Sequence, residues 1–304
     1  MTPKNLAASV HARLAQLARG ANRLFLETLQ YYAMERFLYR LCRSPYADRF
    51  VLKGALMLRV WDAPTARPTK DVDLLGRMAN SLDNLASVVR EICAVEVEPD
   101  GLLFQETTVK AERIKVDADY QGVRVRFVGM LGKAKITMQL DVGFGDVVVP
   151  GPEEIDYPAL LEFPAPRLKG YSRESVIAEK FEAMVKLGTL NSRMKDFYDI
   201  WLLSRQFDFD GATLTRAVTV TFAHRETDLD PKPVALTPAF SESAVADTQW
   251  RAFVRKGKFA PAPQHLSETV AAVAEFLLPI ARARNAGDAF VMMWTPSGPW
   301  RPRR

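Results

Sequence analysis

The sequence contains few of the residues that mark disulfide frameworks or histidine-based catalysis. Its 304 residues include two cysteines, Cys42 and Cys93, and three histidines, His11, His224 and His265. The cysteines lack CxxC spacing and fall in segments predicted to be helical, so they indicate buried thiols in a reducing compartment. The histidines lie far from the acidic clusters described below and form no nucleophile–base pattern. A disulfide-stapled fold and a histidine catalyst are therefore not expected.

The sequence also lacks long apolar runs. No stretch reaches the roughly 18–20 apolar residues that cross a bilayer, and no apolar core follows a basic start at the N-terminus. We therefore expect a cytoplasmic protein without a membrane partner. The chain is 48% hydrophobic and 25% charged, as is usual for a globular protein. Its net charge of +5 permits an anionic partner but supports nucleic acid only weakly.

Hydrophobic periodicity and proline content divide the chain into a β-containing half and a helical half. A connector with five prolines lies between positions 150 and 166. We expect N-terminal helices and a mixed sheet over 1–150, a helical domain that completes the active-site cleft over 151–288, and a basic Pro/Trp/Arg tail over 289–304. Expected helices lie at about 5–43 (with a break near Gly20 and Asn22), 82–93 (with Ser81 as N-cap), 173–188, 193–206, 210–222, 243–256 and 266–283. Expected strands lie at about 49–52, 70–75, 95–98, 114–120, 122–128 and 135–142.

Asp71 and Asp73 are the most informative polar residues of the sheet-forming half. Because side chains alternate along a strand, the two carboxylates point to the same side. Burying both without compensation would cost several kcal/mol, and Mg²⁺ or Mn²⁺ is the natural partner for hard oxygen ligands. The alternative without a metal is a pair of solvated carboxylates at a strand edge.

Two further features strengthen the metal interpretation. The apolar strand that ends at Asp141 can pair with the strand carrying Asp71 and Asp73, which would complete a three-carboxylate site. Asp141 could also accept the proton of an attacking hydroxyl. Gly54 stands between a strand and a short helix, where its backbone can approach phosphate oxygens.

In the helical half, Lys180 lies beside the apolar stripe of its helix, and Asp196 and Asp199 share one face of the next helix. A functional interpretation makes Lys180 a cation for a triphosphate, with Asp196 orienting it. The alternatives are a lysine whose stem covers apolar surface and an acidic pair that stabilises the first turn of a helix. Near residue 250, a segment with Trp250 and Arg251 fits RNA contact or an amphipathic helix equally well.

Five segments in this order resemble the AbiEii/AbiGii toxin family of nucleotidyltransferases, which includes the mycobacterial MenT toxins. They are FLYRLCRSPYADRFVLKGALML, RPTKDVDLL, ITMQLDVGFGD, RESVIAEKFEAMVKLG and SRMKDFYDIWLL. The resemblance implies an α+β fold with a DNA polymerase β-like nucleotidyltransferase core and a helical C-terminal domain. It also implies Mg²⁺-dependent use of an NTP and a cognate antitoxin.

Carried over residue by residue, the family's motifs fall on Gly54 with Asp71 and Asp73, then on Asp141, Lys180 and Asp196. The implied metal ligands are Asp71, Asp73 and Asp141. The nucleotide-binding residues expected on these grounds are Lys53, Gly54, Ala55, Thr69, Lys180 and Asp199. One position departs from the pattern: many relatives carry Ser or Thr where this chain has Ala55. The missing hydroxyl removes a phosphate hydrogen bond worth roughly 1–3 kcal/mol, for which Thr69 or backbone amides could compensate.

The sequence thus predicts an NTP-dependent nucleotidyltransferase toxin of a type IV-like toxin–antitoxin pair, with the 3′ end of tRNA as the leading acceptor. Alanine at Asp73 or Lys180 should then abolish transfer without unfolding the protein. Two alternatives stay open: nucleotidyl or phosphoryl transfer to a protein hydroxyl, and a non-catalytic module whose NTP site regulates binding to a partner.

Overall fold

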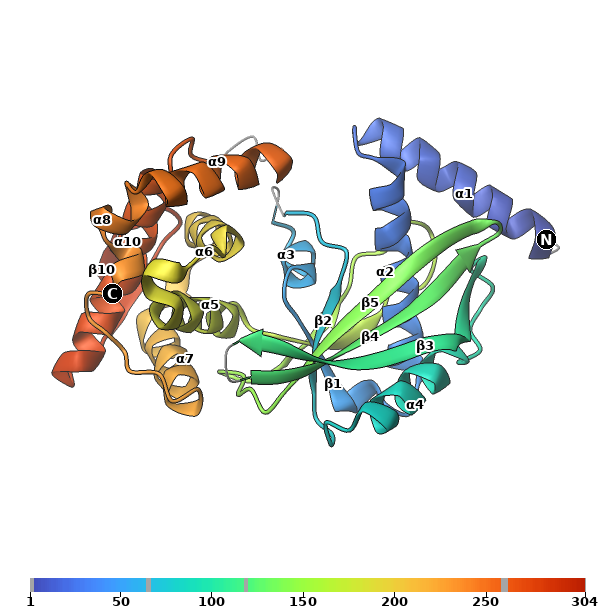
Figure 1. The fold of residues 1–304 in the computed structure, drawn as a ribbon, viewed down its shortest axis with the longest axis horizontal. Helices are drawn as coiled ribbons and strands as arrows, with labels where there is room; N and C mark the ends of the chain where they lie inside the picture. Colours follow the sequence, from blue (N-terminus) through green and yellow to red (C-terminus); the bar gives the residue numbers. More distant parts are fainter. Residues whose placement is uncertain (1–2, 64–66, 118–119, 258–261, 304) are drawn as a thin grey trace. The chain divides into compact units, whose positions relative to one another are not determined.

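The structure is a computed structural model that describes residues 3–63, 67–117, 120–257 and 262–303. The chain forms two compact units, each built from several stretches of sequence (Figure 1). The first unit comprises Met1–Asp62, Pro68–Gly145 and Glu153–Gly170; the second comprises Ala63–Arg67, Asp146–Pro152 and Tyr171–Arg304. Among the described residues, no helix is both long enough and apolar enough to cross a membrane.

The first unit is organised around a seven-stranded sheet in the order β3-β4-β5-β2-β1-β7-β6. Its strands are β1 (Phe50–Lys53), β2 (Val72–Gly76), β3 (Leu102–Asp117), β4 (Tyr120–Leu131), β5 (Ala134–Phe144), β6 (Glu153–Asp156) and β7 (Arg167–Gly170). The pairs β2–β5 and β1–β7 are parallel and the others are antiparallel. The expected mixed sheet flanked by helices is therefore confirmed.

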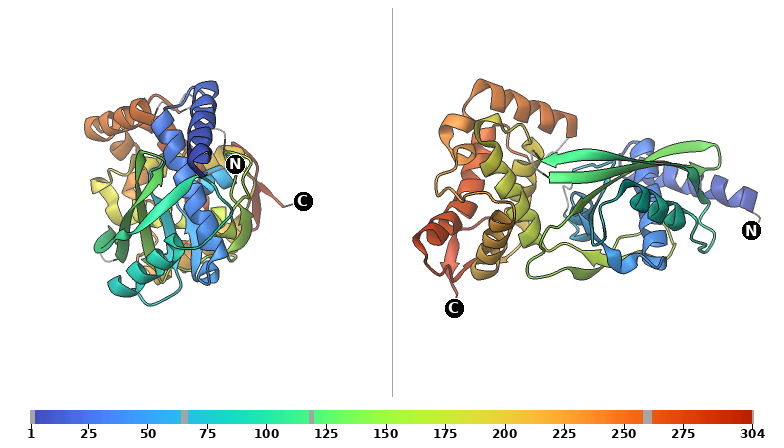
Figure 2. Two further views of the ribbon diagram at one scale, coloured as in Figure 1. Left: turned by 90° about the vertical axis from the view of Figure 1, so that its right-hand side faces the viewer. Right: turned by 60° about the horizontal axis from the view of Figure 1, so that its bottom comes forward.

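Two helices cover one face of this sheet. The helices of the unit are α1 (Pro3–Gly20), α2 (Phe25–Arg43), α3 (Leu56–Val60) and α4 (Leu82–Cys93), with a 3₁₀ turn at Ala47–Arg49. On α2, the ring of Phe37 lies 5.1 Å from that of Phe127 on β4. Both additional views place α2 and α4 against the long strands β3, β4 and β5 (Figure 2). Side chains of β4 and β5 that face these helices are buried, and those that alternate with them are partly exposed.

Local sequence signals set the helix boundaries. Asn22, with φ of 50°, separates α1 from α2 as expected. The hydroxyl of Ser81 accepts a hydrogen bond from the backbone N–H of Asn84 and caps α4. The helix predicted to start near Gly54 has only five residues, Leu56–Val60. Its macrodipole is accordingly short, so phosphate binding there would depend on backbone N–H groups.

The second unit is mainly helical, as expected. Its helices are α5 (Arg173–Leu187), α6 (Met194–Gln206), α7 (Gly211–His224), α8 (Pro238–Ser241), α9 (Ala244–Gly257) and α10 (Leu266–Ala286), with 3₁₀ turns at Gly188–Leu190 and Val234–Leu236. A small antiparallel sheet combines β8 (Phe209–Asp210), β9 (Met292–Trp294) and β10 (Trp300–Pro302). Trp250 is fully buried on α9, and its indole N–H donates to the Pro263 carbonyl. It is therefore not exposed for stacking on RNA bases, and the amphipathic-helix interpretation of this segment is favoured.

The structure corrects one strand and divides the chain differently from the expected boundaries. The strand predicted at 95–98 is wrong. These residues form a loop that follows α4, and the backbone N–H of Val95 donates to the Ile92 carbonyl in the turn that ends this helix. The hairpin β6–β7 adds to β1 at the sheet edge, which places 153–170 in the first unit instead of with the helical half beginning at 151. The tail after 288 is part of the second unit, since β9 and β10 pack Trp294 and Trp300 against Phe276 of α10.

Candidate functional site

The strand register brings charged residues of three separate strands into one row, in which Asp71, Asp73 and Asp141 form the acidic row. β1 pairs with β2 so that Lys53 is opposite Asp73, and β2 pairs with β5 so that Asp73 is opposite Asp141. The predicted pairing of the Asp141 strand with the Asp71/Asp73 strand is thus confirmed. Asp71 stands just before β2, two residues from Asp73, and the side chains of all three aspartates are partly exposed.

Gly54 lies directly against Asp73. The glycine has φ of 71°, and a β-carbon built on it would fall 2.7 Å from the carboxyl carbon of Asp73 and 2.8 Å from its β-carbon. Real side chains do not approach so closely, so the Asp73 carboxylate occupies the space that any larger residue would need. The turn between β1 and α3 therefore requires glycine both for its backbone conformation and for its contact with Asp73.

Thr69 and Ala55 occupy supporting positions in the same unit. The backbone N–H of Asp71 donates to the Thr69 hydroxyl over 3.3 Å, and the backbone N–H of Thr69 donates to the Tyr31 hydroxyl over 3.1 Å. Thr69 therefore fixes the backbone where the acidic pair begins. Ala55 is only 3% exposed, so its methyl group belongs to the core.

Arg124 is a residue of this site that the sequence analysis did not identify. It lies opposite Asp141 in the β4–β5 pair, and its Nε and Nη2 donate to the two carboxylate oxygens of Asp141 over 2.7 Å each. This hydrogen bond, supported by the nearby charge of Asp71, raises the pKa of Arg124. The sequence shows that Arg124 and Arg126 alternate with apolar residues and so share one face of a strand. The partner of Arg124 follows only from the strand register.

These residues fit a divalent cation in part. Asp71 and Asp73 offer carboxylate oxygens, the donors that Mg²⁺ and Mn²⁺ prefer, and both take part in interactions within the structure. Asp141 directs both of its oxygens to Arg124. Over the described ranges, no group of three or more His, Cys, Asp or Glu side chains is arranged to hold a metal ion. The three-carboxylate metal site therefore stays a prediction, and the Asp71/Asp73 pair is its best-fitting part.

The second unit contains a separate cluster of buried charges on α5 and α6. Lys180 donates to Asp196 over 2.7 Å and lies 2.8 Å from Asp199. Arg193 binds the second oxygen of Asp196 at 2.7 Å. Arg67, which the sequence analysis left unassigned within the RPTKDVDLL segment, holds Asp199 through Nε and Nη2 at 2.9 and 3.1 Å. The expected contact between Asp196 and Lys180 is present, and helices α5 and α6 bring the two residues together.

The charges of this cluster fix its protonation states. Burial would lower the pKa of Lys180, but Asp196 and Asp199 outweigh this effect and raise it. Burial would likewise raise the pKa of Asp196, but Lys180, Arg193 and Lys195 lower it to about 2. The pKa of Asp199 is also lowered, against its burial, by Arg67 and Lys180. Four cations therefore surround two carboxylates, and the cluster keeps net positive charge at neutral pH.

The low pKa of Asp196 predicts a specific loss of stability in acid. Its ionised form stabilises the folded state fully above the unfolded pKa near 4, and this contribution disappears as pH falls through about 2. The difference is on the order of 2 kcal/mol. Between about pH 4 and pH 2, wild type should therefore lose more unfolding free energy than Asp196→Asn, and the two losses should differ by this amount. Denaturant titrations at several pH values measure it, with Asp83→Asn on exposed α4 surface as control; parallel curves for wild type and Asp196→Asn would contradict the assignment.

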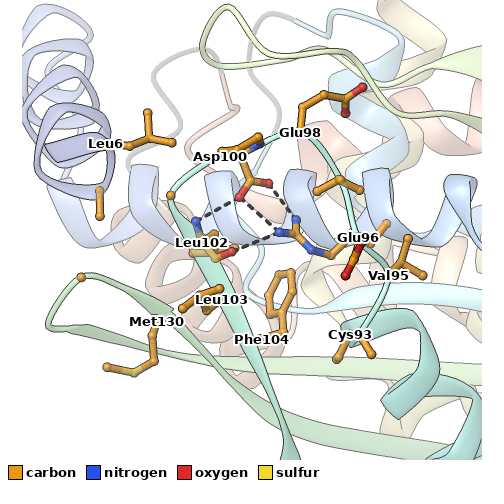
Figure 3. A pocket seen from close by; sticks show the side chains of 17 residues that line it. Leu6, Cys93, Val95, Glu96, Glu98, Asp100, Leu102, Leu103, Phe104 and Met130 are labelled. Atoms are coloured by element: carbon orange, nitrogen blue, oxygen red, sulfur yellow. Dashed lines mark hydrogen bonds and ion pairs between the residues drawn. The ribbon is translucent and has the colours of Figure 1, made fainter. Parts of the chain in front are cut away.

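A pocket of about 720 Å³ in the first unit lies apart from the acidic row. Its wall includes Asp100, whose carboxylate is held by Arg40 at 2.7 and 3.2 Å and by the backbone N–H of Leu102 (Figure 3). Met130 also lines it, six residues along β4 from Arg124, which corresponds to roughly 20 Å of strand. The Asp100–Arg40 pair in its wall is thus already satisfied, and the pocket lies at a distance from the acidic row, so it is not the candidate site.

Comparison with known proteins adds a family assignment to this geometry. The model of the family described as "Nucleotidyl transferase AbiEii toxin, Type IV TA system" matches residues 36–275. The matched segment is well over half of the 304 residues and contains every candidate residue named above. No curated protein matches the chain.

Two solved structures from Helicobacter pylori are similar to the chain. JHP933 is 15% identical with a TM-score of 0.46, and the alignment covers 83% of this chain and 92% of JHP933. A second protein, provisionally described as a nucleotidyltransferase, is 16% identical with a TM-score of 0.45; the alignment covers 84% of this chain and 95% of that protein.

Proposed function

The chain belongs to the AbiEii family of nucleotidyl transferase toxins of type IV toxin–antitoxin systems, and on that premise we propose that it transfers a nucleotide from an NTP to the 3′ end of an RNA. The leading acceptor is tRNA, since blocking its 3′ end would stop aminoacylation and translation. A cognate antitoxin is the expected protein partner, and the cytoplasm, where NTP and tRNA meet, is the expected place of action.

The observation that carries the proposal is the acidic row of the first unit. Asp73 lies directly opposite Asp141 on adjacent parallel strands, with Asp71 two residues away and the Gly54 backbone against the Asp73 carboxylate. Carboxylates gathered on a rigid sheet beside a glycine turn are suited to a divalent ion shared with substrate phosphates. In the proposal Asp71 and Asp73 hold Mg²⁺ or Mn²⁺. When bound, the ion would neutralise phosphate charge and polarise the reacting phosphoryl group.

The remaining residues have roles in a single displacement at phosphorus. The acceptor 3′-hydroxyl attacks the α-phosphorus, the bond from that phosphorus to the bridging oxygen breaks, and pyrophosphate leaves with the bonding electrons. Asp141 accepts the hydroxyl proton. Lys180, within a cluster of net positive charge, binds the triphosphate, and Asp196 and Asp199 keep its ammonium in place. Lys53, Gly54 and Thr69 shape the nucleotide side of the site.

Incubation with labelled NTP and total RNA tests the reaction. The account predicts that α-labelled NTP transfers label to RNA in the presence of Mg²⁺, whereas γ-labelled NTP leaves its label in pyrophosphate. Label found on protein alone would favour nucleotidyl or phosphoryl transfer to a protein hydroxyl. Tight binding of Mg²⁺ and NTP without label transfer to any acceptor would favour a non-catalytic module.

Gly54→Ala is expected to reduce transfer by about a hundredfold, because the new methyl group must displace the Asp73 carboxylate. Gly287→Ala is the matched control: Gly287 has a similar φ of 76°, but a β-carbon there meets no atom within 4 Å. Both variants bear the backbone cost of roughly 1–2 kcal/mol, and only Gly54→Ala disturbs the acidic row. Initial rates of label transfer compare them, and equal activity of the two variants would show that the Asp73 contact is irrelevant.

A further inference from the structure

We propose that Arg124 is a positioning residue that withholds Asp141 from the metal ion and the acceptor until the nucleotide binds. The inference rests on the proposed function and adds a control step to it. The starting observation is that a single guanidinium occupies both carboxylate oxygens of Asp141, the residue expected to complete the site.

The backbone itself fixes this ion pair. Arg124 and Asp141 are directly opposite one another on the antiparallel strands β4 and β5, so their side chains leave the sheet on the same face. The Arg124 side chain is 27% exposed and that of Asp141 18%, which limits screening by water. Gln139 reaches the same carboxylate, with its Nε2 at 3.4 Å from Oδ2. Asp141 is thus held by neighbours on two strands.

This arrangement has a direct consequence for the chemistry. The guanidinium of Arg124 forms two parallel N–H···O bonds with Asp141 and places a positive charge beside the carboxylate. This charge repels an approaching cation and weakens metal binding at Asp141. Both oxygens of Asp141 already accept a hydrogen bond from Arg124, and the guanidinium occupies the side from which an acceptor hydroxyl would otherwise approach them. Arg124 must therefore move before Asp141 can act.

The incoming triphosphate is the group suited to move it. A guanidinium binds phosphate oxygens through the same two-pronged geometry that it uses with a carboxylate, and a triphosphate carries more negative charge than Asp141. Exchange of Arg124 from Asp141 to the phosphates would release the carboxylate only when the substrate is present. The site would then bind its divalent ion weakly until a nucleotide is present.

Arg126 provides a matched control on the same strand. It lies two residues beyond Arg124 and therefore on the same face of β4. Its partners are Glu112 at 2.6 Å and Gln139 at 3.2 Å, and its side chain is 46% exposed. Arg126→Met removes the same charge as Arg124→Met without removing a bond to Asp141.

Mn²⁺ binding to the full-length protein without nucleotide tests the inference. Electron paramagnetic resonance titrations of free Mn²⁺ should show at least about tenfold tighter binding by Arg124→Met than by wild type, and unchanged binding by Arg126→Met. Arg124→Lys keeps the charge but loses the two-pronged bond, so an intermediate affinity is expected. Arg124→Lys also tests the inference if Arg124→Met folds poorly. In label transfer, Arg124→Met should raise the KM for NTP by about tenfold, while Arg126→Met leaves it unchanged.

The outcomes separate this inference from the proposed function. Equal Mn²⁺ affinity of wild type, Arg124→Met and Arg124→Lys would overturn the role of Arg124, while label transfer by wild type would still support the nucleotidyltransferase. Tighter Mn²⁺ binding by Arg124→Met with no transfer by wild type would support the ion-pair role and overturn the proposed reaction.

Discussion

Replacing Asp73 by asparagine is expected to reduce nucleotide transfer at least about a thousandfold while leaving the fold intact. Asparagine has nearly the same shape but lacks the negative charge, and losing a charged metal ligand at the reacting centre removes about 4 kcal/mol of transition-state stabilisation. Removing one of three neighbouring carboxylates also relieves repulsion, so the unfolding temperature should stay the same or rise. Initial rates and thermal unfolding of the same preparation measure both effects.

Asp83→Asn is the control for Asp73→Asn. It makes the same chemical change in the same unit, at an exposed position in the first turn of α4, and should leave transfer unchanged. A variant Asp73→Asn that keeps more than a tenth of wild-type activity would contradict the role of Asp73 as a metal ligand. A large drop in its unfolding temperature would instead reveal a structural role.

Lys180→Met is expected to abolish detectable transfer and also to lower the unfolding free energy by about 3 kcal/mol. Lys180 is 12% exposed, and its ammonium is paired with two aspartates that are each 1% exposed. Removing one partner of a buried charge pair costs roughly 3–5 kcal/mol when the other charge is left alone. Arg193 and Arg67 still hold the two aspartates after Lys180→Met, so the lower end of this range is expected. The sequence alone suggested that alanine at this position would leave the fold undisturbed; the burial of Asp196 and Asp199 argues against that part of the expectation.

Binding measurements separate the two effects of Lys180→Met. At a temperature where the variant is folded, its affinity for NTP should fall, because a cation of the triphosphate site is missing. Lys256→Met, at an exposed position of α9 in the same unit, should change neither stability nor affinity. Unchanged NTP affinity of folded Lys180→Met would restrict Lys180 to a structural role.

Much of the local structure could be predicted from the sequence, because its signals are local. The Ser81 cap and the helix break near Asn22 both depend on neighbouring residues, and both are found where expected. The apolar strand ending at Asp141 was recognisable, and its pairing with the strand of Asp73 is confirmed. The alternation of apolar residues at 95–98 predicted a strand that the structure lacks. An alternating pattern indicates a strand only where a neighbouring strand is available for pairing.

The partners of the charged residues could not be predicted, because they depend on the register between distant strands and on the packing of helices. Arg124 meets Asp141 only when β4 and β5 pair in one of several sterically similar registers. Arg67 meets Asp199 across 132 positions of sequence. The same limit explains the domain boundary. A proline-rich segment suggested a linker after 150, whereas β6 within it and β7 just after it extend the first sheet beyond β1.

The most direct test of the account is sequencing of RNA 3′ ends after incubation of total RNA with the purified protein, Mg²⁺ and each NTP in turn. The account predicts added nucleotides at the 3′ ends of tRNA with wild type and none with Asp73→Asn. Unextended 3′ ends with every NTP, from a wild-type protein shown to be folded and to bind Mg²⁺, would contradict it.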